Sequence, residues 1–264
     1  MENLGFVGTG TMARAILAGI FKKQQNLNIM CYDKNEANYS FLKENKVKFC
    51  NGCAEVFACC KYVVLAVKPQ NYVEVLSDIK DVVNENTVFV SIAAGICAEF
   101  VSAYFGFSVK FIQVMPNTPI KIGFGAVAIS KTENVKDFEF SFAKGIFSGS
   151  ATVCEISRDK MNYIIPINGS SPAFIYCFAK GFLSFAKKNS VDERVALELF
   201  CSSLIGSAKM MLDCGKTIDE LIGEVNSKKG TTQEGLNVLN KHNFLEIIEE
   251  VCEKTAKRAL ELCK

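Results

Sequence analysis

A glycine-rich turn near the start of the chain has the residue types and the spacing of a phosphate-binding loop. Gly8, Gly10 and Ala13 form the pattern G-x-G-x-x-A between an expected strand and an expected helix, which is the context of the dinucleotide-binding fingerprint. The first glycine permits a tight turn, the second lets the backbone approach a pyrophosphate, and the start of the helix offers N–H donors to the anion. The sequence therefore predicts that a dinucleotide binds at this turn.

An acidic residue ends the next expected strand, about 20 residues after the glycines, where a carboxylate accepts hydrogen bonds from the adenine ribose of NAD. This residue is Asp33, and Lys34 follows it. A carboxylate repels a 2′-phosphate whereas the lysine attracts one, so Asp33 favours NADH without excluding NADPH. The alternative interpretation is that Asp33 only starts a turn.

Short β-branched runs alternate with helical patterns through the first 157 residues, and these elements must position the turn. The runs are almost continuously apolar, as strands buried on both faces of a parallel sheet are. We expect strands at 4–7, 27–32, 62–67, 87–92 and 110–114, helices at 12–23, 36–45, 72–83 and 98–105, and two edge strands at 126–130 and 152–156 joined by a helix at 135–147. This alternation predicts an α/β fold with a Rossmann-type doubly wound parallel sheet.

The chain becomes helical in pattern after residue 158. We expect helices at 160–189 (interrupted near Pro166 and Pro172), 191–212, 218–225, 231–240 and 245–263. The sequence thus divides into a dinucleotide-binding Rossmann domain, 1–157, and an all-α domain, 158–264. The helix at 191–212 is apolar on more of its surface than so small a domain can bury, which predicts oligomerisation.

Composition excludes several classes of protein. The chain has 264 residues, of which 49% are hydrophobic and 22% charged, so it is neither disordered nor fibrous. A net charge of +2 gives no basic field for nucleic acid, and no run reaches the 18 or so consecutive apolar residues of a membrane span. The 12 cysteines lack the dense spacing of a secreted disulfide framework, and we therefore expect a cytoplasmic protein.

The cysteines also raise a metal or redox alternative. Cys50 and Cys53 form C-x-x-C, and Cys59 and Cys60 follow closely, but no second C-x-x-C is present and the single histidine, His242, is far along the chain. Zinc sites need four convergent ligands. The interpretation we prefer is that the cysteines are ordinary buried thiols and that there is no metal site.

Four further motifs indicate a family. They are the sequences AVKPQ at 66–70, VMPNTP at 114–119, NGSSPAF at 168–174 and SKKGTT at 227–232. In this order, and over essentially the whole chain, they resemble pyrroline-5-carboxylate reductase, the last enzyme of proline biosynthesis. The resemblance implies hydride transfer from NADPH or NADH to the C=N bond of 1-pyrroline-5-carboxylate, giving L-proline. It also implies that the helical domain pairs with a second subunit as a homodimer, in many members as a ring of dimers, and that one subunit's substrate loop meets its partner's Rossmann domain.

The resemblance also implies site residues. Those expected to bind the cofactor are Gly8, Thr9, Gly10, Thr11, Met12, Asp33, Ala66, Val67, Lys68, Ala93, Ala94, Gly95 and Asn117. Those expected to bind the substrate carboxylate through the start of a helix are Ser227, Gly230, Thr231 and Thr232. The hydroxyl of Thr232 is the expected catalytic donor to the ring nitrogen. Such an imine needs little acid catalysis because it arrives partly protonated, which agrees with a chain that has one histidine.

Alternatives accompany these roles. Lys68 is interpreted as a cofactor contact, although related hydroxyacid dehydrogenases use a lysine as an acid, and Thr231 and Thr232 are also adequate as simple helix caps. The family usually has Ser-Pro-Gly-Gly where this chain has Ser227-Lys228-Lys229-Gly230, so the loop loses one glycine that can take positive φ. Cys53 lies near the place where many members have an asparagine.

Two other functions remain open at this stage. One is a β-hydroxyacid dehydrogenase or another imine reductase, but residues 172–176 lack the lysine that those hydroxyacid enzymes carry after a glycine-rich helix start. The other is a non-catalytic nucleotide sensor, which only the altered loop at 227–232 favours.

Overall fold

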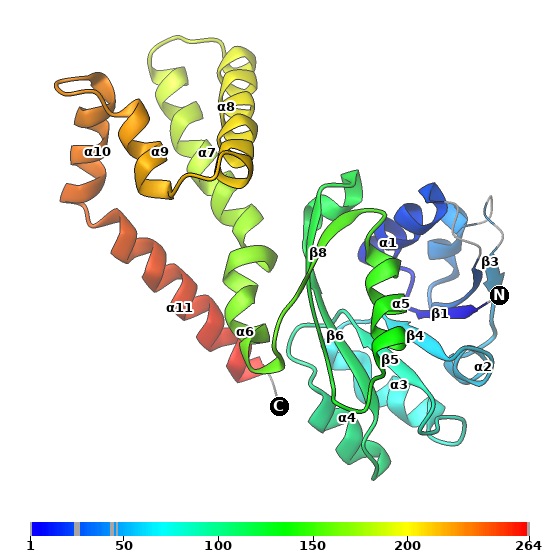
Figure 1. Ribbon diagram of the computed structural model, residues 1–264. Coiled ribbons are helices and arrows are strands. Elements are labelled where there is room, and N and C mark those ends of the chain that lie inside the picture. Colours follow the sequence, from blue (N-terminus) through cyan, green and yellow to red (C-terminus); the bar gives the residue numbers. More distant parts are fainter. Residues whose placement is uncertain (1, 24–26, 43–44, 46, 263–264) are drawn as a thin grey trace. The chain divides into compact units, whose positions relative to one another are not determined.

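The computed structural model describes residues 2–23, 27–42, 45 and 47–262 (Figure 1). The described residues form two compact units, one of residues 2–172 with 254–262 and the other Ala173–Glu253. Residues 158–172 group with the first unit because Met161 and Ile165 pack against Met115 and Ala128 of its sheet. The compact units thus divide at 172/173, whereas the sequence domains 1–157 and 158–264 stay a prediction.

The first unit contains one sheet of eight described strands, in the order β3-β2-β1-β4-β5-β6-β7-β8. Its strands are β1 (Asn3–Val7), β2 (Asn28–Tyr32), β3 (Val47–Phe49), β4 (Tyr62–Leu65), β5 (Val88–Ser91), β6 (Lys110–Pro116), β7 (Gly125–Lys131) and β8 (Ala151–Glu155). All neighbours pair in parallel except β6 and β7, which are antiparallel. The predicted doubly wound sheet is therefore confirmed, with its last two strands reversed.

Both units also contain helices. They are α1 (Thr11–Lys22), α2 (Cys53–Cys59), α3 (Tyr72–Ile79), α4 (Ala98–Phe105), α5 (Asp137–Phe147), α6 (Met161–Ile164), α7 (Ser171–Lys188), α8 (Glu193–Asp213), α9 (Ile218–Val225), α10 (Thr231–Lys241) and α11 (Phe244–Leu262). Shorter turns are 3-10 helices at Glu36–Leu42, Pro69–Asn71, Thr118–Ile122 and Arg158–Lys160, and a π-helix at Ile165–Gly169.

Several sequence expectations need correction. The strand expected at 126–130 is not an edge strand, because β7 lies between β6 and β8 and only β8 is outermost. The helix expected at 36–45 is a 3-10 helix over Glu36–Leu42, and residues 43–44 lie outside the described residues. β3 and α2 were not predicted, since β3 has three residues with a lysine at its centre and α2 has seven.

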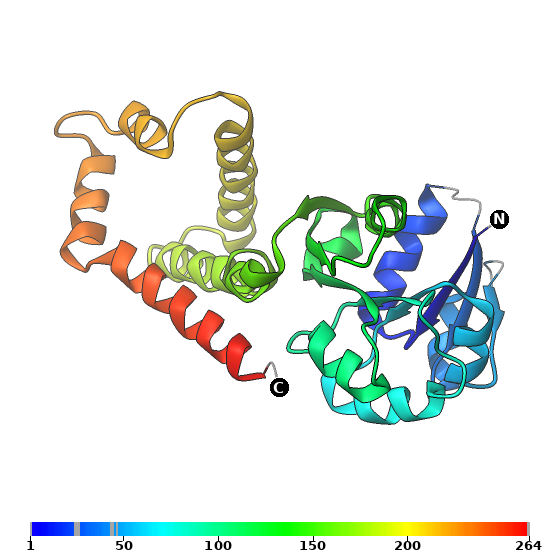
Figure 2. The same cartoon turned by 60° about the horizontal axis from the view of Figure 1, so that its bottom comes forward.

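Alternate strand residues bury into separate cores on the two faces of the sheet. Leu4 and Phe6 pack with residues of α1 and α5, while Val7 packs with residues of α2, α3 and α4. Figures 1 and 2 show α1 and α5 together on one side of the sheet. Because apolar side chains leave both faces, most residues of the central strands are apolar, which is why the sequence indicated these strands so clearly.

The second unit has almost no core of its own. Ala186 is the only buried residue among residues 173–253, all of which the structure describes. α7 and α8 lie side by side (Figures 1 and 2), and Phe182 and Phe200 meet between them with ring centroids 4.9 Å apart. Long apolar side chains stay exposed on α8, including Leu199 at 64% and Ile205 at 61%. This unit therefore presents apolar surface that the single chain does not cover.

A buried carboxylate connects α5 to β6 and to the residue that precedes β4. Glu139 is in the first turn of α5 with its side chain 1% exposed, and its Oε1 lies 2.8 Å from Lys61 Nζ and 2.9 Å from Lys110 Nζ. Its other oxygen accepts a hydrogen bond from the backbone N–H of Lys136 at 3.0 Å. Burial opposes ionisation, but these hydrogen bonds outweigh it and lower the pKa of Glu139 to about 2.

Replacing Glu139 should therefore cost stability in a pH-dependent way. Glu139→Gln leaves two partly buried ammonium groups unpaired, so we expect the free energy of unfolding at pH 7 to fall by about 3 kcal/mol. Because the native pKa is depressed, the advantage of the wild type is complete above about pH 5 and disappears as the pH falls toward 2. Urea unfolding of both proteins at pH 7 and pH 3 measures this difference.

Asp137→Asn is the matched control, since Asp137 begins the same helix and its side chain is 98% exposed. It should change stability little at either pH. An equal loss for Glu139→Gln at both pH values would contradict the assigned role.

Candidate functional site

The glycine-rich turn lies at the carboxyl end of β1, where the strand order reverses direction. β1 pairs with β2 on one side and with β4 on the other, and ligands bind at such reversals in open α/β sheets. The N–H of Gly8 donates to the carbonyl of Tyr32 at 2.8 Å, and the N–H of Ala66 donates to the carbonyl of Val7 at 2.8 Å. These two hydrogen bonds fix the turn between the ends of β2 and β4.

The two glycines of the turn are required for different reasons. Gly8 has φ +91°, and a Cβ there would lie 2.7 Å from the carbonyl oxygen of Ala66. Gly10 has φ −67°, which any residue can adopt, and a Cβ there would meet no atom within 4 Å. The fold thus requires Gly8, while Gly10 borders open space in front of the turn.

The start of α1 is built for an anion. Gly10 is the N-cap, no side chain caps the helix, and no acidic residue is in the first turn, so the first N–H groups keep their positive field free for a ligand. Near this turn, Nε of Arg14 is buried without a hydrogen-bond partner. A phosphate fits this donor set, and the residues present therefore fit a nicotinamide dinucleotide.

A cleft of about 400 Å³ opens beside the turn. It brings together these predicted cofactor residues: Gly8, Gly10, Asp33, Ala66, Val67 and Lys68. It also includes residues that were not predicted to bind the cofactor, among them Tyr32, Asn71, Glu74 and Gln70, which ends the AVKPQ motif. Those on α3 and on the turn before it were missed because no local pattern shows that this segment faces the end of β2.

The carboxylate of Asp33 accepts hydrogen bonds from the turn and from the residues that follow it. Its Oδ2 accepts hydrogen bonds from the N–H of Thr9 at 2.6 Å, from Thr9 Oγ1 at 3.1 Å and from Asn38 Nδ2 at 3.1 Å, while Oδ1 accepts from the N–H of Asn35 at 2.8 Å. Partial burial opposes ionisation, but these hydrogen bonds outweigh it and lower the pKa of Asp33. Asp33 thus does start a turn, and its contact with a ribose stays a prediction.

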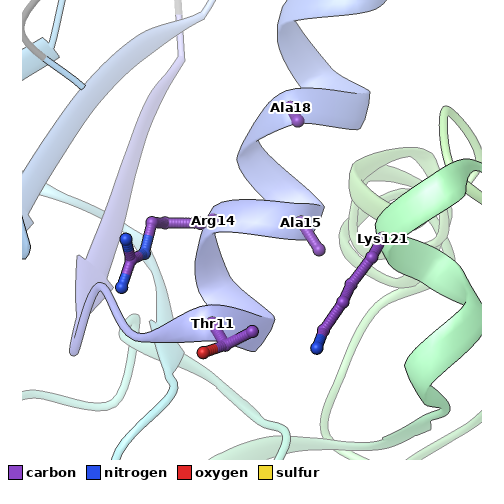
Figure 3. A pocket seen from close by; sticks show the side chains of 5 residues that line it. All are labelled: Thr11, Arg14, Ala15, Ala18 and Lys121. Carbon is purple, nitrogen blue, oxygen red and sulfur yellow. The ribbon is translucent and has the colours of Figure 1, made fainter. Parts of the chain in front are cut away.

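A second cleft, of about 310 Å³, lies along α1 (Figure 3). Thr11, Arg14, Ala15, Ala18 and Lys121 line it. Figure 3 shows the Arg14 and Lys121 side chains on opposite sides of the first turns of α1, and Arg14 donates to Asn38 Oδ1 at 3.2 Å. Neither cation was predicted from the sequence, although Arg14 follows Gly10 by one helical turn.

The residues expected near the nicotinamide lie after β5 and β6. In the part of the chain that the structure describes, Ala93, Ala94, Gly95 and Asn117 are not in the lining of the larger cleft. Gly95 has φ +78°, and a Cβ there would lie 2.7 Å from the carbonyl oxygen of Leu262. Asn117 Oδ1 accepts a hydrogen bond from the N–H of Ala126 at 2.8 Å. Gly95 and Asn117 therefore have structural roles. The cofactor contacts of Ala93, Ala94, Gly95 and Asn117 stay predictions.

The predicted substrate loop lies in the second unit and forms a tight turn before α10. The N–H of Gly230 donates to the carbonyl of Ser227 at 2.9 Å, and Lys229 has φ +64°. The lysine thus keeps the left-handed conformation for which the family uses glycine. Gly230 is the N-cap of α10 and no side chain caps this helix, so the interpretation of Thr231 and Thr232 as caps is wrong. Both threonines are exposed at the start of α10.

The cysteines that the structure describes differ in burial. Four of them, Cys31, Cys50, Cys53 and Cys60, are buried, and burial raises the pKa of Cys53, which lines the larger cleft, to about 12. The expectation of buried thiols is wrong for five others, Cys59, Cys154, Cys177, Cys201 and Cys214, which are exposed. In the residues described, no group of three or more possible metal ligands is present.

Comparisons with known proteins agree with this arrangement. The model of the family pyrroline-5-carboxylate reductase dimerisation matches residues 158–262, and that of NADP oxidoreductase coenzyme F420-dependent matches residues 3–95. The chain is 31% identical to pyrroline-5-carboxylate reductase 2 of Bacillus subtilis, over 99% of this chain and 95% of that protein. The chain belongs to the pyrroline-5-carboxylate reductase family.

Solved structures of pyrroline-5-carboxylate reductases have the same fold. One from Coxiella burnetii superposes with a TM-score of 0.92 and 26% identity, over 100% of this chain and 99% of that chain. One from Plasmodium falciparum with NADP bound has a TM-score of 0.88 and 24% identity, over 100% and 98%. The predicted family and fold class are therefore confirmed.

The contrast between the two glycines gives a testable prediction for this member of the pyrroline-5-carboxylate reductase family. Gly8→Ala forces positive φ on alanine and a clash with Ala66, so we expect it to reduce the free energy of unfolding by about 2–4 kcal/mol. Gly10→Ala should leave stability within about 0.5 kcal/mol but fill the space in front of the turn and weaken nucleotide binding. Thermal unfolding and NADH fluorescence titration measure the two effects. Wild-type nucleotide affinity in Gly10→Ala would contradict the binding role of the turn.

Proposed function

We propose that this chain acts as a pyrroline-5-carboxylate reductase, which reduces 1-pyrroline-5-carboxylate to L-proline in the last step of proline biosynthesis. The observation that carries the proposal is the uncapped, acid-free start of α1 beside the cleft, in a chain whose full-length relatives bear that activity in their names. The cofactor is NADPH or NADH. A nicotinamide nucleotide is supported by the match to an NADP oxidoreductase family and by the NADP in the Plasmodium falciparum relative.

The reaction adds a hydride and a proton across one double bond. When bound, a reduced nicotinamide supplies the hydride to the ring carbon of the C=N bond, and the ring nitrogen carries the proton. The pair of electrons from the C=N bond remains on nitrogen, which leaves a C–N single bond. The chain's own contribution is to bind, to orient and to exclude water.

The first unit would hold the cofactor. We assign the pyrophosphate to the backbone of Gly8 to Met12, where the first turn of α1 has no competing cap. Ala66, Val67 and Lys68 follow β4 and line the same cleft, so they would contact the cofactor beyond the pyrophosphate. Lys68 is exposed, which agrees with a contact at the rim of the cleft.

The second unit would hold the substrate. The first N–H groups of α10, those of Thr231 and Thr232, have no side-chain cap and would receive the substrate carboxylate together with the Ser227–Gly230 turn. The hydroxyl of Thr232 would donate a hydrogen bond to the ring nitrogen. This hydrogen bond would stabilise the electron pair that the ring nitrogen gains as the hydride arrives.

We further propose a cytoplasmic homodimer. The dimerisation family match covers the helical region, and much of its apolar surface is exposed in one chain. Among the described helices, α8 alone is long and apolar enough by length and composition to cross a membrane. Glu198 and Lys209 interrupt it, and pairing with a second copy would cover the same surface.

A direct assay tests the activity. Purified protein with 1-pyrroline-5-carboxylate should consume NADH or NADPH, measured as loss of absorbance at 340 nm, and proline should form in equal amount. A protein that binds the nucleotide but oxidises none with this substrate would disprove the proposal. Activity with a β-hydroxyacid instead would favour the hydroxyacid dehydrogenase alternative.

Thr232→Val removes the hydroxyl and keeps the backbone N–H, so it tests the role of the hydroxyl by itself. We expect kcat to fall by about tenfold to a hundredfold, more at alkaline pH, where less imine is protonated. KM should change little because the N–H groups remain. Thr231→Val is the matched control, and equal losses in both variants would contradict a specific role for Thr232.

Subunit complementation tests the shared site. A heterodimer of one Gly10→Ala subunit and one Thr232→Val subunit should recover part of the activity, since one of its two sites has both intact halves. Homodimers of each variant are the controls. No recovery in a purified heterodimer would show that each site lies within one chain.

A further inference from the structure

An ion pair crosses the larger cleft between two segments that are distant in sequence. Lys34 follows Asp33 at the end of β2, and Glu74 is in the first turn of α3; Lys34 Nζ and Glu74 Oε1 are hydrogen-bonded. Both residues line the cleft beside Gly8. The side chains are 58% and 53% exposed, so the pair is solvated and can rearrange.

The position of Lys34 matters because of where a dinucleotide lies in this fold. With its pyrophosphate at the start of α1, the adenine ribose reaches the end of β2, where NAD and NADP are distinguished at the 2′ position. Lys34 and Lys68 are the cations in the lining of the cleft as described, and Lys34 is the one at the end of β2. Lys34 is therefore the group that would form an ion pair with a 2′-phosphate.

Asp33 is poorly placed to decide between the two cofactors. Four hydrogen bonds from Thr9, Asn35 and Asn38 engage its carboxylate. Its Oδ2 already accepts three of them, so Asp33 stays turned toward the glycine turn. The discrimination between the two cofactors then depends on the exposed charged pair at the end of β2, Lys34 and Glu74.

We propose that Glu74 is a specificity-determining residue that disfavours a 2′-phosphate. It neutralises the cation that would bind the phosphate, and its own carboxylate repels the added negative charge. A 2′-hydroxyl carries no charge and is not repelled. This inference rests on the proposed cofactor site and deepens it: the chain discriminates against NADPH through a residue of α3, with Lys34 as the group that Glu74 controls.

Removing the charge of Glu74 tests the proposal without any turnover. Glu74→Gln keeps the size of the side chain, and calorimetry then compares 5′-AMP with 2′,5′-ADP, which differ only by the 2′-phosphate. We expect affinity for 2′,5′-ADP to rise about tenfold while that for 5′-AMP changes less than about twofold, because one like charge is removed at close range. The gain should shrink at about 0.5 M salt, where screening is strong.

Two controls isolate the mechanism. Glu85→Gln makes the same chemical change at an exposed residue outside the lining of the cleft and should alter neither affinity. Adding Lys34→Gln to Glu74→Gln should abolish most of the gain for 2′,5′-ADP. NADP⁺ and NAD⁺ serve as a second pair of ligands, and the ratio of kcat/KM for NADPH over NADH should rise in parallel.

The outcomes distinguish this inference from the function on which it rests. If both nucleotides bind the wild type but Glu74→Gln leaves their affinity ratio unchanged, or raises both affinities equally, the role of Glu74 is overturned and the cofactor site stands. If neither nucleotide binds any variant, the proposed cofactor site is overturned, and the inference with it.

Discussion

The hydrogen bonds from Thr9 to the carboxylate of Asp33 stabilise the end of the sheet at which the glycine turn lies. They join the glycine turn after β1 to the end of β2, and the same carboxylate closes the turn at Asn35. The charged pair of Lys34 and Glu74 lines the cleft beside this turn. An acid at this place is thus first a structural element of the turn.

The first unit is complete because both faces of its sheet are covered. Two cores form from alternate residues of the same strands, and the carboxylate of Glu139 ties α5 to two lysines beneath it. The rigid sheet fixes the turn at the carboxyl end of β1, where Gly8 has positive φ. The open space at Gly10 is then a property of the scaffold, and a ligand does not have to create it.

The second unit, in contrast, buries few of its side chains. Its helices leave most apolar side chains exposed, while the turn before α10 is tightly defined by Ser227 and Gly230. Lys229 accepts a left-handed backbone that costs a non-glycine residue some energy. This turn is held by its own hydrogen bond, on a unit that has little core of its own.

The sequence alone determined the parts of the protein that local patterns encode. Apolar runs indicated the central strands, glycine spacing indicated the turn after β1, and four motifs indicated the family. Short elements such as β3 and α2 were not predicted, because a segment of three to seven residues shows too little hydrophobic periodicity. Tertiary structure alone decided that β7 is interior, that Gly230 caps α10, and that Glu74 pairs with Lys34. The physical reason is distance along the chain: 40 residues separate Lys34 from Glu74, and only the packing of α3 beside the end of β2 brings their charges together.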